Sequence, residues 1–242
     1  MVNIVLDTNI WIYLTKDTFF ELWVKLKEMK HSGQIRVIVN DVIVKEWRRN
    51  KENTIRALSE NIRQEYKAAK NLLNYMPTAK KSNFEDLILE YKEEPQRIIK
   101  ATEKVDNVEK FMLECTIIAT KDSQKLYVAN LAIDKSPPFQ NNKNNFNDAL
   151  IIRNVCEYVN DETPFEWNLI YVSNNPNDFI EKNSKNIFDG LVSDLDRVNI
   201  KNVVELGEAL KMAPEYITDF EEWLENQLEN QSMYELDILR GK

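Results

Sequence analysis

Four acidic residues occupy positions that a parallel sheet would bring together. Asp7 directly follows the apolar run Ile4–Leu6, and Glu46 lies about one turn into the helix predicted after a second strand. Asp148 opens a helix after a long polar loop, and Asp178 follows a third predicted strand by six residues. Because ligands of open parallel sheets bind beyond the carboxyl ends of the strands, we expect these four side chains to meet at that edge.

Carboxylates in such a cluster repel one another unless protons or cations neutralise them. A site of oxygen ligands, without histidine or cysteine, suits a hard cation such as Mg²⁺ or Mn²⁺. Taken singly, each acid also has an ordinary explanation, because an aspartate at a helix N-terminus is usually a cap and Glu46 would be a solvated helix residue. The convergence of the four is therefore what favours a site for one or two metal ions.

The composition excludes several other kinds of catalytic site. The chain has a single histidine, His31, so mechanisms that need two histidines are ruled out. Its two cysteines, Cys115 and Cys156, cannot form a four-thiolate zinc site. Only four glycines occur, and no glycine-rich phosphate-binding motif is present. Aspartate and glutamate remain as the residues on which hydrolysis would depend.

Short apolar runs separated by helical patterns predict the scaffold that would hold these acids. The runs lie at Ile4–Leu6, Ile35–Val39, Leu169–Val172 and about Val198–Val204. Strands that alternate with helices at these distances favour a parallel sheet with right-handed crossovers. The predicted fold is α/β, with a three-layer parallel sheet of four or five strands.

The whole chain, residues 1–242, reads as one domain. Residues from about 50 to 133 carry helical patterns throughout, and this block is too long for a single crossover. We therefore expect a large helical insertion that packs on the α/β core. A last helix is predicted at about 214–240, because Pro214 suits the first turn of a helix.

The acids stand within an ordered series of short motifs. These are Asp7-Thr8-Asn9 after the first strand, Glu46 in the helix after the second, Asn147-Asp148-Ala149-Leu150-Ile151, and the Val-Ser-Asn-Asn-x-x-Asp-Phe segment at 172–179. The series resembles the PIN domain nucleases over most of residues 1–180. Pro137-Pro138-Phe139, followed by an Asn-rich loop, is similar to the larger bacterial PIN-like proteins with a helical insertion.

The resemblance implies an α/β/α sandwich and hydrolysis of phosphodiester bonds with Mg²⁺ or Mn²⁺. Carried over to this chain, it makes Asp7, Glu46 and Asp148 the acidic metal ligands. It also implies that Ser173 donates a hydrogen bond near the first aspartate and that Asn9 organises the turn after the first strand.

The fourth ligand of the resemblance is either Asn175 or Asp178. Many PIN domains carry an aspartate two residues after the Ser/Thr, where this chain has Asn175. An asparagine can bind a metal through its carbonyl oxygen, but it brings no charge. Asp178 is the nearest acid to that position.

Although the net charge of the chain is −8, one region carries an excess of positive charge. Residues 42–81 contain ten Lys and Arg against four Glu, which gives 10 − 4 = +6. Basic residues beside Glu46 and Asp148 are placed to contact phosphates, although such residues on exposed helices are also ordinary solvated side chains. The candidate phosphate contacts are Lys45, Arg48, Arg49, Lys143 and Arg153.

The function that we expect is a Mg²⁺- or Mn²⁺-dependent nuclease, specifically an endoribonuclease, with RNA favoured over DNA. The alternative is a catalytically weak or inactive PIN-like module that binds nucleic acid or docks a partner, and the neutral Asn175 favours it. A phosphatase of the haloacid dehalogenase type also begins with a strand and an aspartate. That chemistry uses a second aspartate two residues on, where this chain has Asn9.

The pattern of apolar residues predicts a cytoplasmic protein. The first apolar run ends at Asp7 after three residues, which is too short for a signal peptide. No stretch approaches the roughly 18 apolar residues of a membrane span, so we expect no membrane contact. A protein regulator and a homo-oligomer both remain open.

Overall fold

The computed structural model describes residues 2–139, 145–162, 167–174, 189–192, 194–195 and 198–214. Lys143, Asn175 and Asp178 lie outside these residues, as does the predicted last helix beyond residue 214. The predictions made for them stay predictions.

Five parallel strands form one sheet, in the order β3-β2-β1-β4-β5. The strands are β1 (Val2–Leu6), β2 (Ile35–Asn40), β3 (Thr116–Ile118), β4 (Trp167–Val172) and β5 (Val198–Val203). The first strand is the central one, because β1 pairs with β2 on one side and with β4 on the other. The predicted α/β class with a parallel sheet is therefore confirmed.

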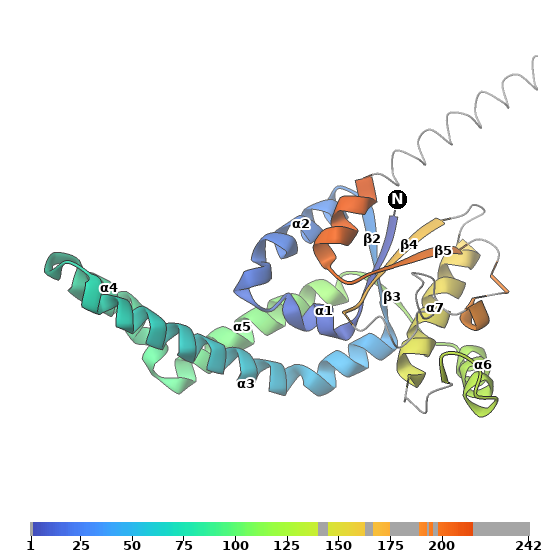
Figure 1. Cartoon of the computed structure of the whole chain (residues 1–242), viewed down its shortest axis with the longest axis horizontal. Coiled ribbons are helices and arrows are strands. Elements are labelled where there is room, and N and C mark those ends of the chain that lie inside the picture. The colour runs from blue at the N-terminus through green and yellow to red at the C-terminus, as the bar shows by residue number, and fades with distance from the viewer. Residues whose placement is uncertain are drawn as a thin grey trace, which may run out of the picture.

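Helices cover both faces of this sheet. Helix α7 (Phe146–Glu162) contacts β2 to β5 on one face, while α2 (Phe20–His31) and the helical residues 206–214 lie on the other (Figure 1). All five residues of β1 are buried, as expected for a strand of a parallel sheet that is covered twice. The short helix α1 (Thr8–Tyr13) follows β1 directly, so its first turn begins at the carboxyl edge of the sheet.

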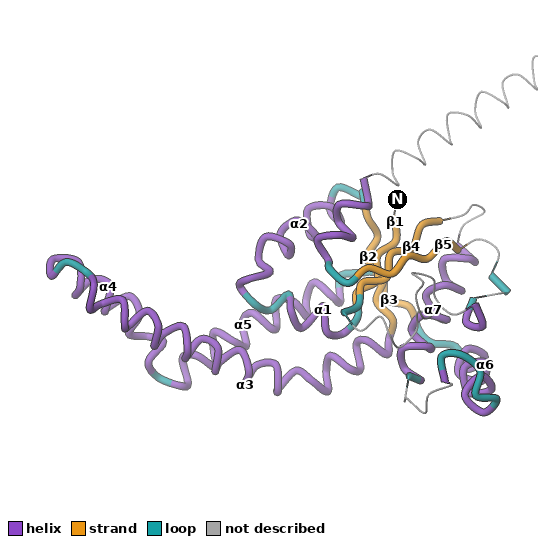
Figure 2. The backbone as a smooth tube through the Cα atoms, in the orientation of Figure 1, coloured by secondary structure: helices purple, strands orange, loops and turns teal. Residues whose placement is uncertain are grey.

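Three helices form an arm that stands out from the sheet (Figures 1 and 2). The arm, residues 41–113, consists of α3 (Asp41–Leu72), α4 (Thr78–Leu89) and α5 (Glu94–Leu113), with short 3-10 turns between them. Asn40 starts the arm, because its side-chain oxygen accepts a hydrogen bond from the backbone N–H of Val42 at 2.7 Å. Helix α3 runs unbroken for 32 residues and packs against α5.

The prediction that residues 50–133 are wholly helical is wrong at one place. Thr116–Ile118 form β3, which pairs with β2 at the edge of the sheet. A strand of three residues is too short to show a period of two between helices on both sides. The block therefore divides into the arm, an edge strand and helix α6 (Asp122–Ile133).

Candidate metal centre

Asp7 is held at the end of the central strand by hydrogen bonds to both oxygens of its carboxylate. Oδ1 accepts from the backbone N–H of Thr8 at 2.6 Å, which makes Asp7 the N-cap of α1. Oδ2 accepts from the hydroxyl of Ser173 at 3.0 Å, in the arrangement that the sequence resemblance implied. Asp7 is only 7% exposed, so its charge lies at the rim of the core.

Glu46 reaches the same edge from the second turn of α3. Its Oε2 accepts a hydrogen bond from the hydroxyl of Thr8 at 2.7 Å, and its Oε1 accepts one from Nδ2 of Asn147, also at 2.7 Å. Thr8 lies beside Asp7, and Asn147 lies beside Asp148. The carboxylate of Glu46 therefore connects the two segments that carry the other acids.

Asp148 completes the group from the first turn of α7. The buried hydroxyl of Tyr171, on β4, interacts electrostatically with all three acids. Burial raises the pKa of Tyr171 well above its ordinary value, and the negative charges of Asp7, Asp148 and Glu46 raise it further. The three carboxylates that the sequence singled out thus lie close enough to Tyr171, at the carboxyl edge of the sheet, for their charges to act on the same phenol.

The donors at this edge are of the type that a hard cation requires. Asp7, Glu46 and Asp148 offer carboxylate oxygens alone, which suit Mg²⁺ or Mn²⁺. The nearby Arg49 approaches Glu46 at 3.8 Å, but its side chain is 67% exposed, so solvent screens its charge. Among the described residues, no three acidic, histidine or cysteine side chains already form a metal-binding group. In its donor chemistry the site fits a hard cation, which Asp7, Glu46 and Asp148 would hold.

Of the predicted phosphate contacts on α3, Arg49 borders this edge on the solvent side, at 3.8 Å from Glu46. Arg48 is exposed too, but at 100° per residue it points about 160° away from Glu46 around the helix. Lys45 is exposed as well, although its Nζ pairs with Asp41 at 2.6 Å. A screened surface pair of this kind contributes little stability and can open when a phosphate arrives.

Arg153 forms a buried structural ion pair instead of the predicted phosphate contact. Its side chain is 7% exposed, and its Nη2 donates to Asp194 at 2.8 Å. The guanidinium also donates to the carbonyl of Leu191 and lies over the ring of Tyr127. Arg153 therefore holds the segment around residues 189–195 against α7 and is not available to a substrate.

The organising role that the resemblance gave to Asn9 is carried by its neighbour in the structure. Asn9 is exposed in the first turn of α1, and its side chain makes no hydrogen bond within the described part of the chain. Thr8 instead bonds Asp7 through its backbone and Glu46 through its hydroxyl. Thr8, Asn147 and Tyr171 were not among the predicted site residues, although two of them adjoin a predicted acid in the sequence.

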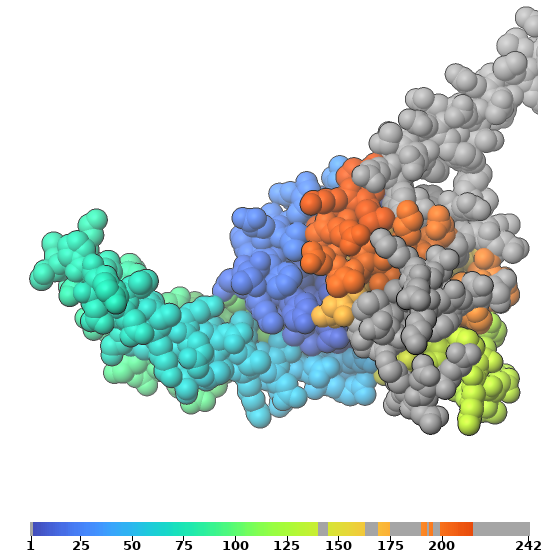
Figure 3. All heavy atoms as spheres, in the orientation of Figure 1, coloured from blue at the N-terminus to red at the C-terminus, as the bar shows by residue number. Residues whose placement is uncertain are grey.

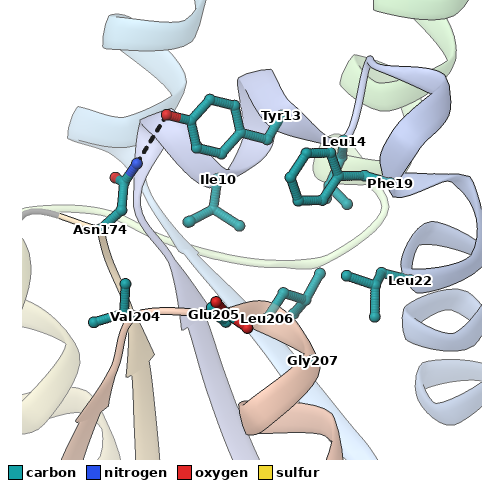
Figure 4. Close-up of a pocket in the computed structure, with 10 residues that line it drawn as sticks. All are labelled: Ile10, Tyr13, Leu14, Phe19, Leu22, Asn174, Val204, Glu205, Leu206 and Gly207. Carbon is teal, nitrogen blue, oxygen red and sulfur yellow. Dashed lines mark hydrogen bonds between the residues drawn. The ribbon is translucent and has the colours of Figure 1, made fainter.

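A pocket of about 330 Å³ opens beside this edge, between α1, α2 and the start of the helical residues 206–214 (Figure 4). In its wall, Nδ2 of Asn174 donates to the hydroxyl of Tyr13 at 2.9 Å. The ring of Tyr13 stacks on Phe19 with a centroid separation of 5.5 Å. Because Asn174 follows Ser173, this bond ties the segment that carries Ser173 to the helix that Asp7 caps.

Comparison with known proteins identifies a family over the part of the chain that carries this site. The family model described as PIN domain matches residues 4–179, a span that contains the three acids and Ser173. No curated protein and no solved structure matches the chain. Within the residues that the structure describes, no helix is long and apolar enough to cross a membrane. With the family model matching most of its length and a five-stranded parallel sheet between helices, the chain belongs to the PIN domain family.

Proposed function

We propose that this protein is a Mg²⁺- or Mn²⁺-dependent phosphodiesterase that cleaves RNA internally. PIN domains are generally nucleases. The observation that carries the proposal for this chain is that Thr8, beside Asp7, and Asn147, beside Asp148, both donate hydrogen bonds to the carboxylate of Glu46. The fourth ligand of the proposal is Asn175 or Asp178, one of which would complete the oxygen set from the segment after β4.

When bound, the cation would lower the pKa of a water molecule and stabilise the negative charge on the leaving oxygen. The residues of the chain supply orientation. Ser173 and the backbone of Thr8 fix the carboxylate of Asp7, so that its oxygens are placed before substrate arrives. Thr8 and Asn147 do the same for Glu46. Such preorganisation reduces the cost of positioning the reacting groups.

Binding of the substrate would fall to the basic start of α3. Arg49 lies on the solvent side of Glu46, where a phosphate approaching the acids would meet it, and Arg48 is exposed on the adjoining face of α3. Lys45 adds a third positive charge once its pair with Asp41 opens. A salt-dependent affinity for nucleic acid is the expected property of such contacts.

The histidine of the chain is not placed to act as an acid or base. His31 ends α2 and lies just before β2, at the amino edge of the sheet, whereas the three acids lie at the carboxyl edge. Its Nδ1 is 2.8 Å from the carbonyl oxygen of Lys27. A route that uses the RNA 2′-hydroxyl and a pair of histidines therefore has no support in this chain.

The proposal is tested by the metal requirement and by the products. Purified protein should cleave a labelled RNA in Mg²⁺ or Mn²⁺, stop in EDTA, and leave a 5′-phosphate and a 3′-hydroxyl. Single-stranded DNA of the same sequence should be cut more slowly. Formation of a 2′,3′-cyclic phosphate in EDTA would show that the proposal is wrong.

The alternative, a non-catalytic module that binds nucleic acid, is favoured by the neutral Asn175. The two proposals separate in the same assay, because the module would bind RNA with no cleavage in either metal. Titration of Mn²⁺ into the protein, followed by calorimetry, gives an independent reading. The nuclease should bind one or two ions, whereas Asp148→Asn should bind them more weakly.

A further inference from the structure

We propose that the tip of the arm, residues 66–84, is a second nucleic-acid-binding site that contacts backbone phosphates far from the carboxylates. This inference rests on the proposed function in one respect, which is that the substrate is a nucleic acid. It goes further, because it assigns a role to the arm and predicts how long a substrate must be to use it.

The composition of the tip differs from that of the rest of the chain. The sequence contains 40 acidic residues among 242, yet no aspartate or glutamate occurs between Glu65 and Glu85. Four lysines lie in the same interval, so the tip carries a charge of +4 in a protein whose net charge is −8. These tip lysines are Lys67, Lys70, Lys80 and Lys81.

The tip lysines also differ from the basic residues nearer the sheet in how they are paired. Along the arm, Lys51 contacts Asp106 and Glu109, Arg56 contacts Glu52, Arg63 contacts Glu60, and Lys104 contacts Asp17. The described residues provide no ion pair for any of the four tip lysines. Their charge is therefore open to an anionic partner, whereas most of the charge along the arm is balanced within the protein.

The tip presents apolar surface of a kind that suits bases. Tyr75 is 87% exposed where the chain turns between α3 and α4, and Leu72 is 56% exposed one helical turn before it. An exposed tyrosine among lysines is the usual composition of a surface on which bases stack while phosphates are neutralised. Asn71 and Asn74 flank the pair Leu72 and Leu73, and the four lysines lie on both sides of the turn, so the tip mixes apolar, polar and basic side chains.

The position of the tip relative to the acids is fixed by one helix. Glu46 and Lys70 both belong to α3, which has no break between them. The 24 residues that separate them span about 36 Å at 1.5 Å per residue. Figure 3 shows the arm extending away from the body of the molecule, with its tip uncovered in this view. At about 3.4 Å per stacked nucleotide, a strand needs roughly ten nucleotides to reach from the acids to the tip.

Binding to RNA of two lengths tests the proposal without any need for cleavage. In EDTA, affinity is measured by fluorescence anisotropy for a single-stranded 6-mer and a 25-mer, with the parent and with a variant that carries glutamine at the four tip lysines. The parent should bind the 25-mer at least about tenfold more tightly than the variant does. The slope of affinity against salt should fall by up to about three, since each phosphate contact on a single strand contributes about 0.7.

Affinity for the 6-mer should fall by a smaller factor than affinity for the 25-mer, because a strand shorter than about ten nucleotides cannot contact the tip and the start of α3 at the same time. Tyr75→Ala alone should weaken the 25-mer by severalfold and leave the salt slope unchanged. A control variant removes the same charge from exposed lysines elsewhere and should bind the 25-mer within about twofold of the parent. Its four positions are Lys25, Lys92, Lys110 and Lys211.

Three results would overturn the proposal: parental affinity in the tip variant, equal losses in the tip and control variants, or no RNA binding by the parent. Loss of binding to vesicles with one third phosphatidylserine, while RNA affinity is kept, would assign the tip to a membrane and overturn it too. The nuclease proposal is tested separately, by measuring RNA cleavage by the parent in Mn²⁺. Failure of the parent to cut RNA would leave the length-dependent binding as evidence for the tip.

Discussion

Small neutral side chains orient the carboxylates of the site. Asp7 is held by Ser173, and Glu46 is held by Thr8 and Asn147. A carboxylate that already accepts two hydrogen bonds has few orientations left to search when a cation binds. The proposed activity therefore depends on these residues as well as on the acids.

Asp7→Asn should lower the cleavage rate by at least about a hundredfold, which corresponds to roughly 2.7 kcal/mol of transition-state stabilisation. The asparagine keeps an oxygen for the backbone N–H of Thr8 but removes the negative charge. In EDTA the melting temperature should stay the same or rise, because repulsion with Glu46 and Asp148 is relieved. Single-turnover cleavage and thermal melting measure the two effects.

The control for this change is Asp122→Asn, which removes an exposed acid from the first turn of α6. It should leave cleavage as it was. If Asp7→Asn instead destabilised the metal-free protein and cut RNA at the parental rate, Asp7 would be a helix cap alone.

Thr8→Val should reduce cleavage by roughly tenfold, or about 1.4 kcal/mol, because Glu46 loses the hydroxyl that orients its Oε2. The backbone N–H that caps Asp7 is unaffected by this change. Thr8→Ser keeps the hydroxyl and should restore most of the rate. A valine variant with a normal rate, or a serine variant as slow as valine, would contradict the positioning role; Mn²⁺ affinity gives a second readout.

The sequence predicted the acids of the site better than it predicted their supports. Asp7 and Asp148 stand out because each follows a clear strand or loop signal, and Glu46 because it lies about one turn into the helix after the second strand. Thr8 looks like an ordinary residue of a turn, and its bond to Glu46 joins positions 38 residues apart. A contact of that separation leaves no local pattern in the sequence.

Among the elements, β1, β2 and β4 were predicted from short apolar runs, and β5 from the apolar residues at its ends and centre. All of β1 and residues 169–172 of β4 are buried in the middle of the sheet, which is why these segments are mostly apolar. β3 was missed because it has three residues and lies at the edge. The helix that carries Arg153 was predicted, but not the direction of its side chain. At 100° per residue, a position five after Asp148 points about 140° away from it.

Arg153→Leu should therefore lower the free energy of unfolding by about 2 kcal/mol and leave RNA affinity unchanged. The buried guanidinium bonds Asp194 and the carbonyl of Leu191, and both bonds are lost. Because Asp194 is half-exposed, water can solvate its charge once Arg153 is replaced. The loss of unfolding free energy therefore stays below the loss expected for a fully buried ion pair. Arg49→Gln provides the converse control, with weaker RNA binding and unchanged stability in urea denaturation.

Over the whole molecule, the two cysteines are part of the core. Burial raises the pKa of both Cys115 and Cys156 to about 12, from an ordinary value of 9.0. In the unfolded chain the thiols lose their protons near pH 9, whereas the folded protein keeps them. The stabilising contribution of the neutral thiols is thus complete below pH 9 and declines as the pH rises from 9 toward 12.

The native protein should accordingly resist alkylation by iodoacetamide at pH 8 and react at both cysteines once unfolded in urea. Between pH 8 and pH 10.5 the urea midpoint should fall more for the parent than for the Cys115→Ala, Cys156→Ala double variant. The difference between the two proteins isolates the contribution of the thiols to the pH dependence, because lysines and tyrosines that titrate in the same range are present in both. Rapid alkylation of the folded protein at pH 8 would contradict the burial of these groups.

The continuity of α3 has a mechanical consequence. Asp7 ends a strand that is bonded on both sides, and Asp148 lies on a helix packed against the sheet, whereas Glu46 belongs to the same unbroken helix as the tip. The start of α3 is buried in the body through Val42, Ile43, Val44 and Trp47, so Glu46 is anchored together with the other two acids. The arm is thus a rigid extension of the site, and its anchored end carries one of the proposed ligands.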